Sequence, residues 1–151
     1  MATVTAAPGT RARTHTGLHI DVHDPLHQAF WLLRIGFTVA PILFGLDKFA
    51  HVLVNWDKYL APEFTDLFNT SAHNLMYAVG AIEIVAGLVV AVRPRFGGYL
   101  VAAWLAGIIV NLLMLGDFYD VALRDFGLLL GALTLARLAV AVDRADDASA
   151  R

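Results

Sequence analysis

Several charged side chains stand inside, or at the ends of, segments that are otherwise almost wholly apolar, and four of them match in depth. These four are Lys48, Glu83, Arg124 and Asp125. A charge in an apolar medium is costly, so such groups usually pair with one another or mark a functional site. We predict that these four side chains form one polar cluster, which either fixes helix packing or binds the headgroup of a quinone or a similar amphipathic molecule. No residue is a convincing nucleophile with a positioned base, so we assign no catalytic residue.

The segments that carry these charges are long and apolar. Hydrophobic residues make up 58 % of the 151 residues, and the mean hydropathy is +0.64. About 20 apolar residues suffice for a helix to cross the hydrocarbon of a bilayer. Four segments reach about this length, at residues 29–54, 74–92, 96–115 and 119–142. A soluble bundle is disfavoured because the stretch "VGAIEIVAGLVVAV" offers water no polar face.

The links between these segments predict how the helices run. "RPR" joins the second to the third and "GDFYD" joins the third to the fourth, and links this short require antiparallel neighbours. The sequence therefore predicts an all-α fold, an integral membrane four-helix bundle that runs up, down, up and down. The longer link, residues 55–73, contains Trp56 and Tyr59, which suit the headgroup region, and we expect an interfacial helix or ordered loop there.

The two ends of the chain are polar. Residues 1–28 form an N-terminal tail that bears four histidines and has no apolar core of a signal peptide, and residues 143–151 form a C-terminal tail. Arginines are concentrated in both tails and in the "RPR" link, so we expect both termini to be cytoplasmic.

The net charge of −2 provides no basic surface for nucleic acid, and the absence of cysteine excludes thiolate ligands and disulfides.

Depth in the membrane determines which charges can meet. At 1.5 Å per residue, Glu83 lies about 13 Å below the start of its segment, within reach of Lys48 or Arg124 if the helices tilt. Asp120 and Arg124 are spaced to pair on one helix face. Asp47 and Lys48 project about 100° apart on a helix, so they do not pair with each other. Lys48 faces either the bundle interior, where it would mark a binding pocket, or the headgroups, where it would anchor the helix.

Histidines recur every four residues near the N-terminus and flank the link at residues 55–73. The first set is His15, His19, His23 and His27, and the second is His51 and His73. Imidazoles on one face can bind a metal. Because Gly17 and Pro25 interrupt any helix through the first set, and because two scattered histidines are a weak pattern, we predict no metal site. We interpret the spacing as chance or as interfacial packing.

Three short motifs resemble the DoxX-like family of small bacterial membrane proteins with four transmembrane helices. They are "GLDKF" in the first segment, "GAIEIVAGLVVAV" in the second and "LRDFGLLLGALTLARL" in the fourth. The resemblance covers residues 29–142. The positions that match the family are Lys48, Glu83, Arg124 and Asp125. It implies a location in the bacterial inner membrane.

The founding members of that family are linked to a terminal quinol oxidase and to thiosulfate:quinone oxidoreductase. The resemblance therefore implies an accessory subunit of a membrane-bound electron-transfer complex, with the bilayer and larger subunits as partners and no catalysis of its own. No bound cofactor is expected, although a quinone is possible. A quinone-binding redox protein in its own right is the first alternative, and a small-molecule transporter is the second.

Overall fold

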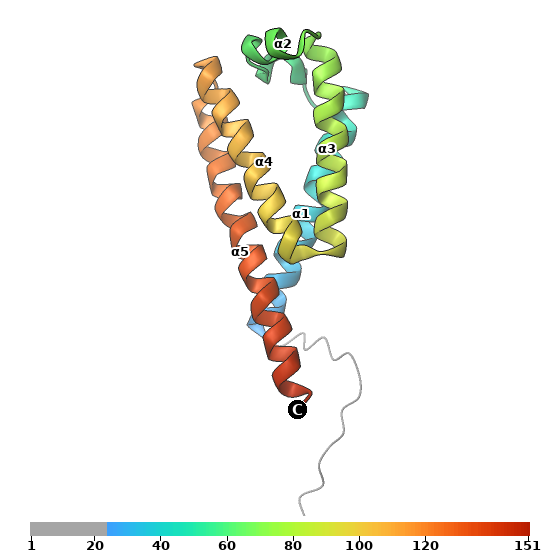
Figure 1. The fold of residues 1–151 in the computed structure, drawn as a ribbon, viewed down its shortest axis with the longest axis vertical. Coiled ribbons are helices and arrows are strands. Elements are labelled where there is room, and N and C mark those ends of the chain that lie inside the picture. Colours follow the sequence, from blue (N-terminus) through green and yellow to red (C-terminus); the bar gives the residue numbers. More distant parts are fainter. Residues whose placement is uncertain (1–23) are drawn as a thin grey trace, which may run out of the picture.

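The computed structural model describes residues 24–151, which are helical almost throughout and contain no strand within that range. The elements are α1 (Pro25–Ala50), the 3₁₀ helix η1 (Trp56–Tyr59), α2 (Pro62–Phe68), α3 (Ala72–Val92), α4 (Pro94–Leu115) and α5 (Tyr119–Ser149). Figure 1 shows α1, α3, α4 and α5 running alternately up and down, with η1 and α2 across one end. We call that end the capped end. The opposite end, where α1 begins and α5 finishes, is the tail end.

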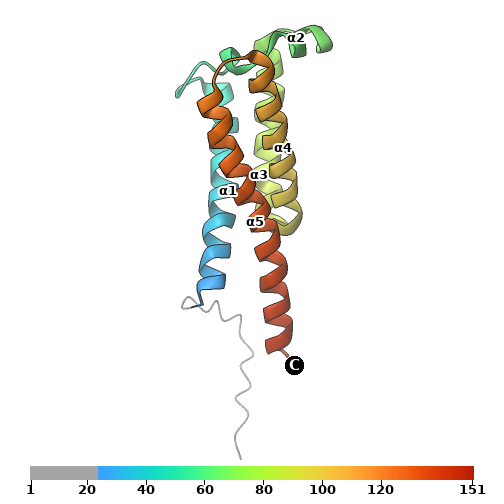
Figure 2. The same ribbon diagram turned by 90° about the vertical axis from the view of Figure 1, so that its left-hand side faces the viewer.

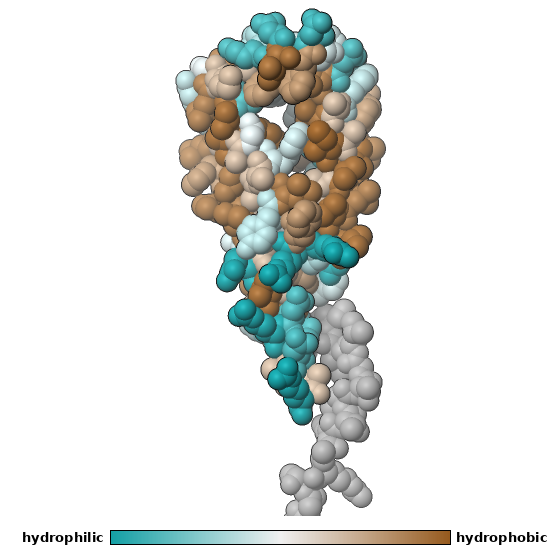
Figure 3. Space-filling view, viewed as in Figure 1, coloured by the Kyte–Doolittle hydropathy of each residue, from teal (hydrophilic) through white to brown (hydrophobic). Residues whose placement is uncertain are grey.

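The surface has the distribution of a membrane protein. In the described part of the chain, α1, α3, α4 and α5 are each long and apolar enough to cross a bilayer. Large apolar side chains on these helices point outward, among them Leu32, Leu43 and Leu123. On the face drawn in Figure 3, an apolar band crosses the middle of the molecule, with polar residues concentrated above and below it. The chain is therefore an all-α, multi-pass membrane bundle, as predicted.

Three helix boundaries differ from the sequence prediction by about one turn or more. α1 begins at Pro25, not at residue 29, because Asp24 caps the helix by accepting a hydrogen bond from the backbone N–H of Leu26 (3.0 Å). α1 also ends at Ala50, four residues before the predicted end, where His51 takes a left-handed conformation with φ 53°. α5 continues past residue 142 to Ser149, since no glycine or proline interrupts that stretch. The predicted tail at residues 143–151 is thus mostly helix.

The helices pack as two pairs, α1 with α3 and α4 with α5. Gly45 and Gly80 bring the first pair into backbone contact: a Cβ added at Gly45 would lie 2.6 Å from the carbonyl oxygen of Gly80. Gly98 does the same for the second pair, with an added Cβ 2.7 Å from the carbonyl oxygen of Ala132. Small residues therefore set the helix spacing, as they do in many membrane bundles.

The two pairs meet closely toward the tail end and separate toward the capped end, as Figure 1 shows between α3 and α4. Figure 2, turned by 90°, shows the same four long helices side by side beneath the cap. Val90, Leu135 and Ala132 are fully buried in the apolar core. The buried charged residues Asp47, Lys48, Glu83 and Asp125 lie nearer the capped end. The interior is therefore apolar toward the tail end and contains charged side chains toward the capped end.

Asn111 attaches the cap to the bundle from α4. Its side-chain oxygen accepts from the backbone N–H of Ala61 (2.9 Å), and its side-chain nitrogen donates to the backbone carbonyl of Tyr59 (2.6 Å). The ring of Tyr59 also packs on Phe118 at the start of α5, with centroids 4.7 Å apart. The loop predicted to lie at the membrane interface is therefore ordered and rests on α4 and α5.

Candidate functional site

The centre of the candidate site is an ion pair between α1 and α3. The ammonium Nζ of Lys48 lies 2.6 Å from Oε2 of Glu83, and the two side chains are 5 % and 10 % exposed. Lys48 therefore faces the bundle interior, which was one of the two orientations left open by the sequence. The pair is possible because Gly45 and Gly80, on the same helices, let the two backbones approach. A buried pair of this kind keeps both charges in the interior at the cost of desolvating them.

Asp47 organises the start of the loop that covers this pair. Its Oδ1 accepts hydrogen bonds from the backbone N–H groups of Val52 and Leu53 (3.0 Å each), and its Oδ2 accepts from the indole N–H of Trp56 (2.7 Å). The indole ring of Trp56 lies over Lys48, whose Nζ is 4.0 Å from the ring centroid. Adjacent residues thus have distinct roles, since Asp47 positions the Trp56 ring and Lys48 contacts it.

Asp125 joins the same interior from α5. It is buried, and its charge interacts with those of both Lys48 and Glu83. Arg124 does not join it: its side chain is 67 % exposed, and it reaches Asp125 at 3.4 Å instead of Glu83 or Asp120. The predicted cluster of four is therefore a cluster of three with a peripheral arginine. The reason is rotational, because neighbouring residues on a helix project about 100° apart.

Trp104 is a fourth member that the sequence prediction missed. Its indole N–H is buried and interacts with the Glu83 carboxylate, but it does not reach the geometry of a full hydrogen bond with any described residue. Trp104 and Glu83 both lie about 16 Å from the capped ends of their helices at 1.5 Å per residue, so the helices place them at one level. An unsatisfied buried donor is uncommon and costs about 1–3 kcal/mol. A single tryptophan within the apolar residues of segment 96–115 was the available signal.

The cluster combines donors and acceptors in an apolar setting. Lys48 and the Trp104 indole can donate hydrogen bonds, while Glu83 and Asp125 can accept them or carry a proton. The ammonium of Lys48 balances the charge of Glu83, and the guanidinium of Arg124 balances that of Asp125 from the periphery. Figure 3 shows an opening in the surface just below the cap, between the two helix pairs, on the side where α3 and α4 diverge. An interior of this composition suits a small polar headgroup that enters from the membrane.

A second group of polar side chains lies on the capped end. His51, Asp57 and His73 have ligand-type atoms that all lie within 4.8 Å of one another. Together with Asn55 they line an open pocket of about 350 Å³. The two histidines come from the end of α1 and the start of α3, and Asp57 comes from η1.

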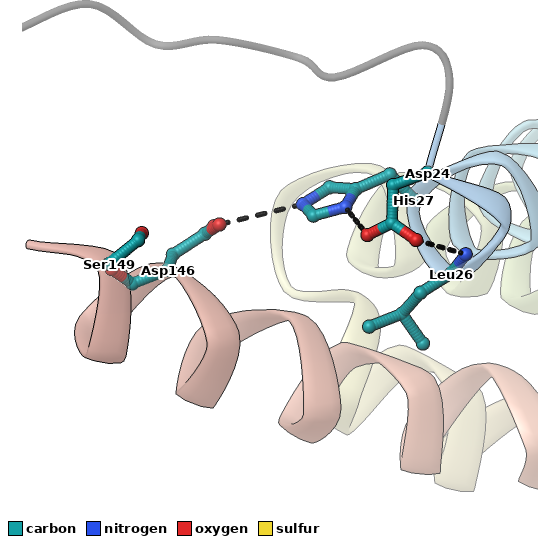
Figure 4. A network of polar contacts seen from close by, with 5 residues as sticks. All are labelled: Asp24, Leu26, His27, Asp146 and Ser149. Carbon is teal, nitrogen blue, oxygen red and sulfur yellow. Dashed lines mark hydrogen bonds and ion pairs between the residues drawn. The ribbon is translucent and has the colours of Figure 1, made fainter. Parts of the chain in front are cut away.

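A third polar group joins the two ends of the chain at the tail end. Figure 4 shows His27 between the N-cap residue Asp24 and Asp146 of α5, with its Nδ1 2.8 Å from Asp24 and its Nε2 3.5 Å from Asp146. The hydrogen bond with His27 lowers the pKa of Asp24 from its ordinary value. His27 is therefore part of a packing contact between α1 and α5. His15, His19 and His23, and most of the predicted tail, lie outside the described residues.

Searches against protein-family models, curated proteins and solved structures find no match to this chain. The resemblance to the DoxX-like family therefore stays a prediction. Of the four positions that suggested this resemblance, Lys48, Glu83 and Asp125 lie together in the interior, and Arg124 lies at the periphery.

Proposed function

We propose that this protein is an accessory subunit of a membrane-bound electron-transfer complex and that it holds the headgroup of a quinone. In the proposed location, the bacterial inner membrane, both termini are cytoplasmic and the capped end is outside. The orientation is supported by Arg93, Arg95 and Arg144, which lie at or near the tail end, because basic residues favour the cytoplasmic side. The observation that carries the ligand proposal is the buried indole N–H of Trp104, which lies beside the Lys48–Glu83 pair without a full hydrogen bond.

The incompletely hydrogen-bonded donor separates this proposal from a purely structural role. An ion pair that serves only helix packing needs no further donor beside it, and an indole N–H that is not fully hydrogen-bonded in an apolar interior is a net cost. A quinone carbonyl oxygen would accept from Trp104, and a second acceptor on the ring would be within the range of the flexible Lys48 side chain. The carboxylates of Glu83 and Asp125 could then take the protons that a quinol releases. The electrons would pass to or from a redox subunit of the complex, which is why we propose an accessory role.

Calorimetric titration of the purified full chain in lipid nanodiscs tests the ligand proposal. The probes are short-chain ubiquinone and menaquinone analogues, and the variants are Trp104→Phe and Glu83→Gln. Loss of one hydrogen bond, worth about 1 kcal/mol, weakens affinity about fivefold. Trp31→Phe is the matched control, because Trp31 packs against Phe30 and Arg34 near the tail end. Equal affinity for the parent protein and both site variants would refute quinone binding at this cluster.

The accessory role needs a separate experiment. Extraction from native membranes in mild detergent, followed by purification through a tag on this chain, should recover redox subunits in fixed stoichiometry. Recovery of the free protein or a homo-oligomer would count against an accessory role and would leave quinone binding as a property of the chain alone.

A further inference from the structure

We propose that His51, Asp57 and His73 form a binding site for a divalent transition-metal ion, such as zinc, on the capped end of the protein. The proposal departs from the sequence prediction, in which no metal site was expected, and it does not depend on the proposed quinone site. It rests on three neighbouring ligand groups, on an oxygen of Asp57 that lacks a partner, and on the partner that fixes His73.

The residue types match the preference of such ions. Two imidazoles with one carboxylate are a common set of protein ligands for zinc and for other first-row metals, with one or more positions left for water or substrate. The candidate atoms of His51, Asp57 and His73 already lie within 4.8 Å of one another. A bound ion would draw them in by a modest side-chain rotation, since ligands stand about 2.0–2.2 Å from zinc.

The arrangement of His73 favours one mode of binding. Its Nε2 lies 2.9 Å from the hydroxyl of Tyr77, while its Nδ1 faces Oδ2 of Asp57 at 3.3 Å. With Nε2 hydrogen-bonded to Tyr77, Nδ1 can face an ion held between it and the carboxylate. Histidines that bind metals generally use their second nitrogen in such an outer hydrogen bond, which orients the ring. Without an ion, a proton on Nδ1 forms an ordinary hydrogen bond to Asp57.

Asp57 and His51 supply the remaining features. Oδ1 of Asp57 is buried and has no hydrogen-bond partner in the described part of the chain, so the carboxylate has an unused acceptor in the pocket. His51 stacks on His73 with ring centroids 5.1 Å apart, and both rings are exposed to an ion arriving from solvent. The left-handed backbone at His51, which ends α1, directs the chain into the loop that carries Asp57.

Such an ion would fasten three elements of the capped end together, namely the end of α1, η1 and the start of α3. Trp56, which covers Lys48, immediately precedes Asp57. Metal binding would therefore stabilise the loop that closes the buried cluster. The pocket leaves room for water or for a further ligand to complete the coordination.

Zinc titration by calorimetry tests the site in the full chain, purified through a tag without histidine. Because the histidines of residues 1–23 could bind metal themselves, the parent protein for the test carries His15→Gln, His19→Gln and His23→Gln. We expect one saturable equivalent of zinc, and a cobalt(II) absorption spectrum that shows nitrogen and oxygen ligands. Asp57→Asn and His73→Gln should each abolish or strongly weaken this binding.

Two further variants sharpen the result. Tyr77→Phe removes the outer hydrogen bond to His73 and should weaken binding about 10-fold, because outer partners typically contribute 10- to 100-fold to metal affinity. His27→Gln, which changes a histidine at the tail end, should leave binding unchanged. The proposal is overturned if the parent takes up no zinc, or if Asp57→Asn binds it as the parent does while circular dichroism shows both to be folded.

Discussion

Lys48 extends from the last turn of α1 to Glu83, which lies about halfway along α3, and the two charged atoms are 2.6 Å apart. The contact spans about one helical turn, because the Cβ of Lys48 packs beside Gly80, which precedes Glu83 by three residues. It brings a cation from the edge of the apolar region into the interior. The ion pair therefore depends on the close packing of α1 and α3. Loss of the ion pair should in turn destabilise that packing.

Removal of one member of the pair should be more harmful than removal of both. Lys48→Met leaves Glu83 buried without a cation, which costs about 3–5 kcal/mol of the free energy of unfolding, while Lys48→Met with Glu83→Leu should recover most of that loss. Reversible unfolding in mixed detergent micelles measures both. Lys58→Met is the control, because Lys58 is exposed and lies over Tyr59. A single variant no less stable than the control would contradict the buried pair.

Asp47 should be essential to the covering loop. Asp47→Ala leaves two backbone N–H groups and the Trp56 indole without their acceptor, and each lost hydrogen bond is worth about 0.5–1.5 kcal/mol. We expect lower stability and faster proteolysis between residues 51 and 71. Asp66→Ala, an exposed position in α2, should behave as the parent. Equal protease resistance in the two variants would show that Asp47 does not hold the loop.

The sequence predicted the four long helices because hydropathy over about 20 residues reports membrane insertion directly. It also predicted Lys48, Glu83 and Asp125 as one cluster, because charges in the membrane interior seek partners. It did not predict that Arg124 would contact Asp125 from the periphery, because these helices are apolar on every side and hydropathy gives no rotational phase. Trp104 was missed because a tryptophan within an apolar helix resembles an ordinary packing residue until its neighbours are known.

The residues at the capped end were the least predictable. The contact of His51 with His73 and Asp57 depends on a left-handed turn at His51 and on a four-residue 3₁₀ helix, and neither has a strong sequence signal. Asp24 and Pro25, in contrast, form a readable start signal for α1, a capping side chain followed by proline. That signal would have corrected the predicted start at residue 29.

Glycines at the helix contacts should tolerate no added methyl group. Gly45→Ala places a Cβ 2.6 Å from the carbonyl oxygen of Gly80, and overpacking of this kind typically costs about 1–3 kcal/mol. Gly107→Ala is the matched control, because nothing lies within 4 Å of its added Cβ, and the higher helix propensity of alanine favours it. Detergent unfolding should therefore separate the two variants in opposite directions. Similar stabilities would contradict the close approach of α1 and α3.

The start of α1 should lose stability in acid. The hydrogen bond with His27 lowers the pKa of Asp24 below its ordinary 3.8, so the folded state favours the carboxylate. That stabilisation is fully present above the unfolded value and is lost as the pH falls through the lower folded value. A carbon-13 NMR titration of the Asp24 carboxyl group should give a midpoint below 3.8. His27→Gln should move the midpoint upward, and an unchanged midpoint would assign the shift to another cause.

Two tryptophans near the ion pair should respond differently to the same substitution. Trp56→Phe leaves Oδ2 of Asp47 without its donor and removes the indole over Lys48, so we expect a loss of about 2 kcal/mol in unfolding free energy. Trp104→Phe removes an N–H that makes no full hydrogen bond with the described residues, and that gain offsets the smaller packing volume of the new ring. In ligand-free nanodiscs Trp104→Phe should therefore be the more stable variant. If it is instead the less stable one, Trp104 donates a structural hydrogen bond, and its indole is not kept free for a ligand.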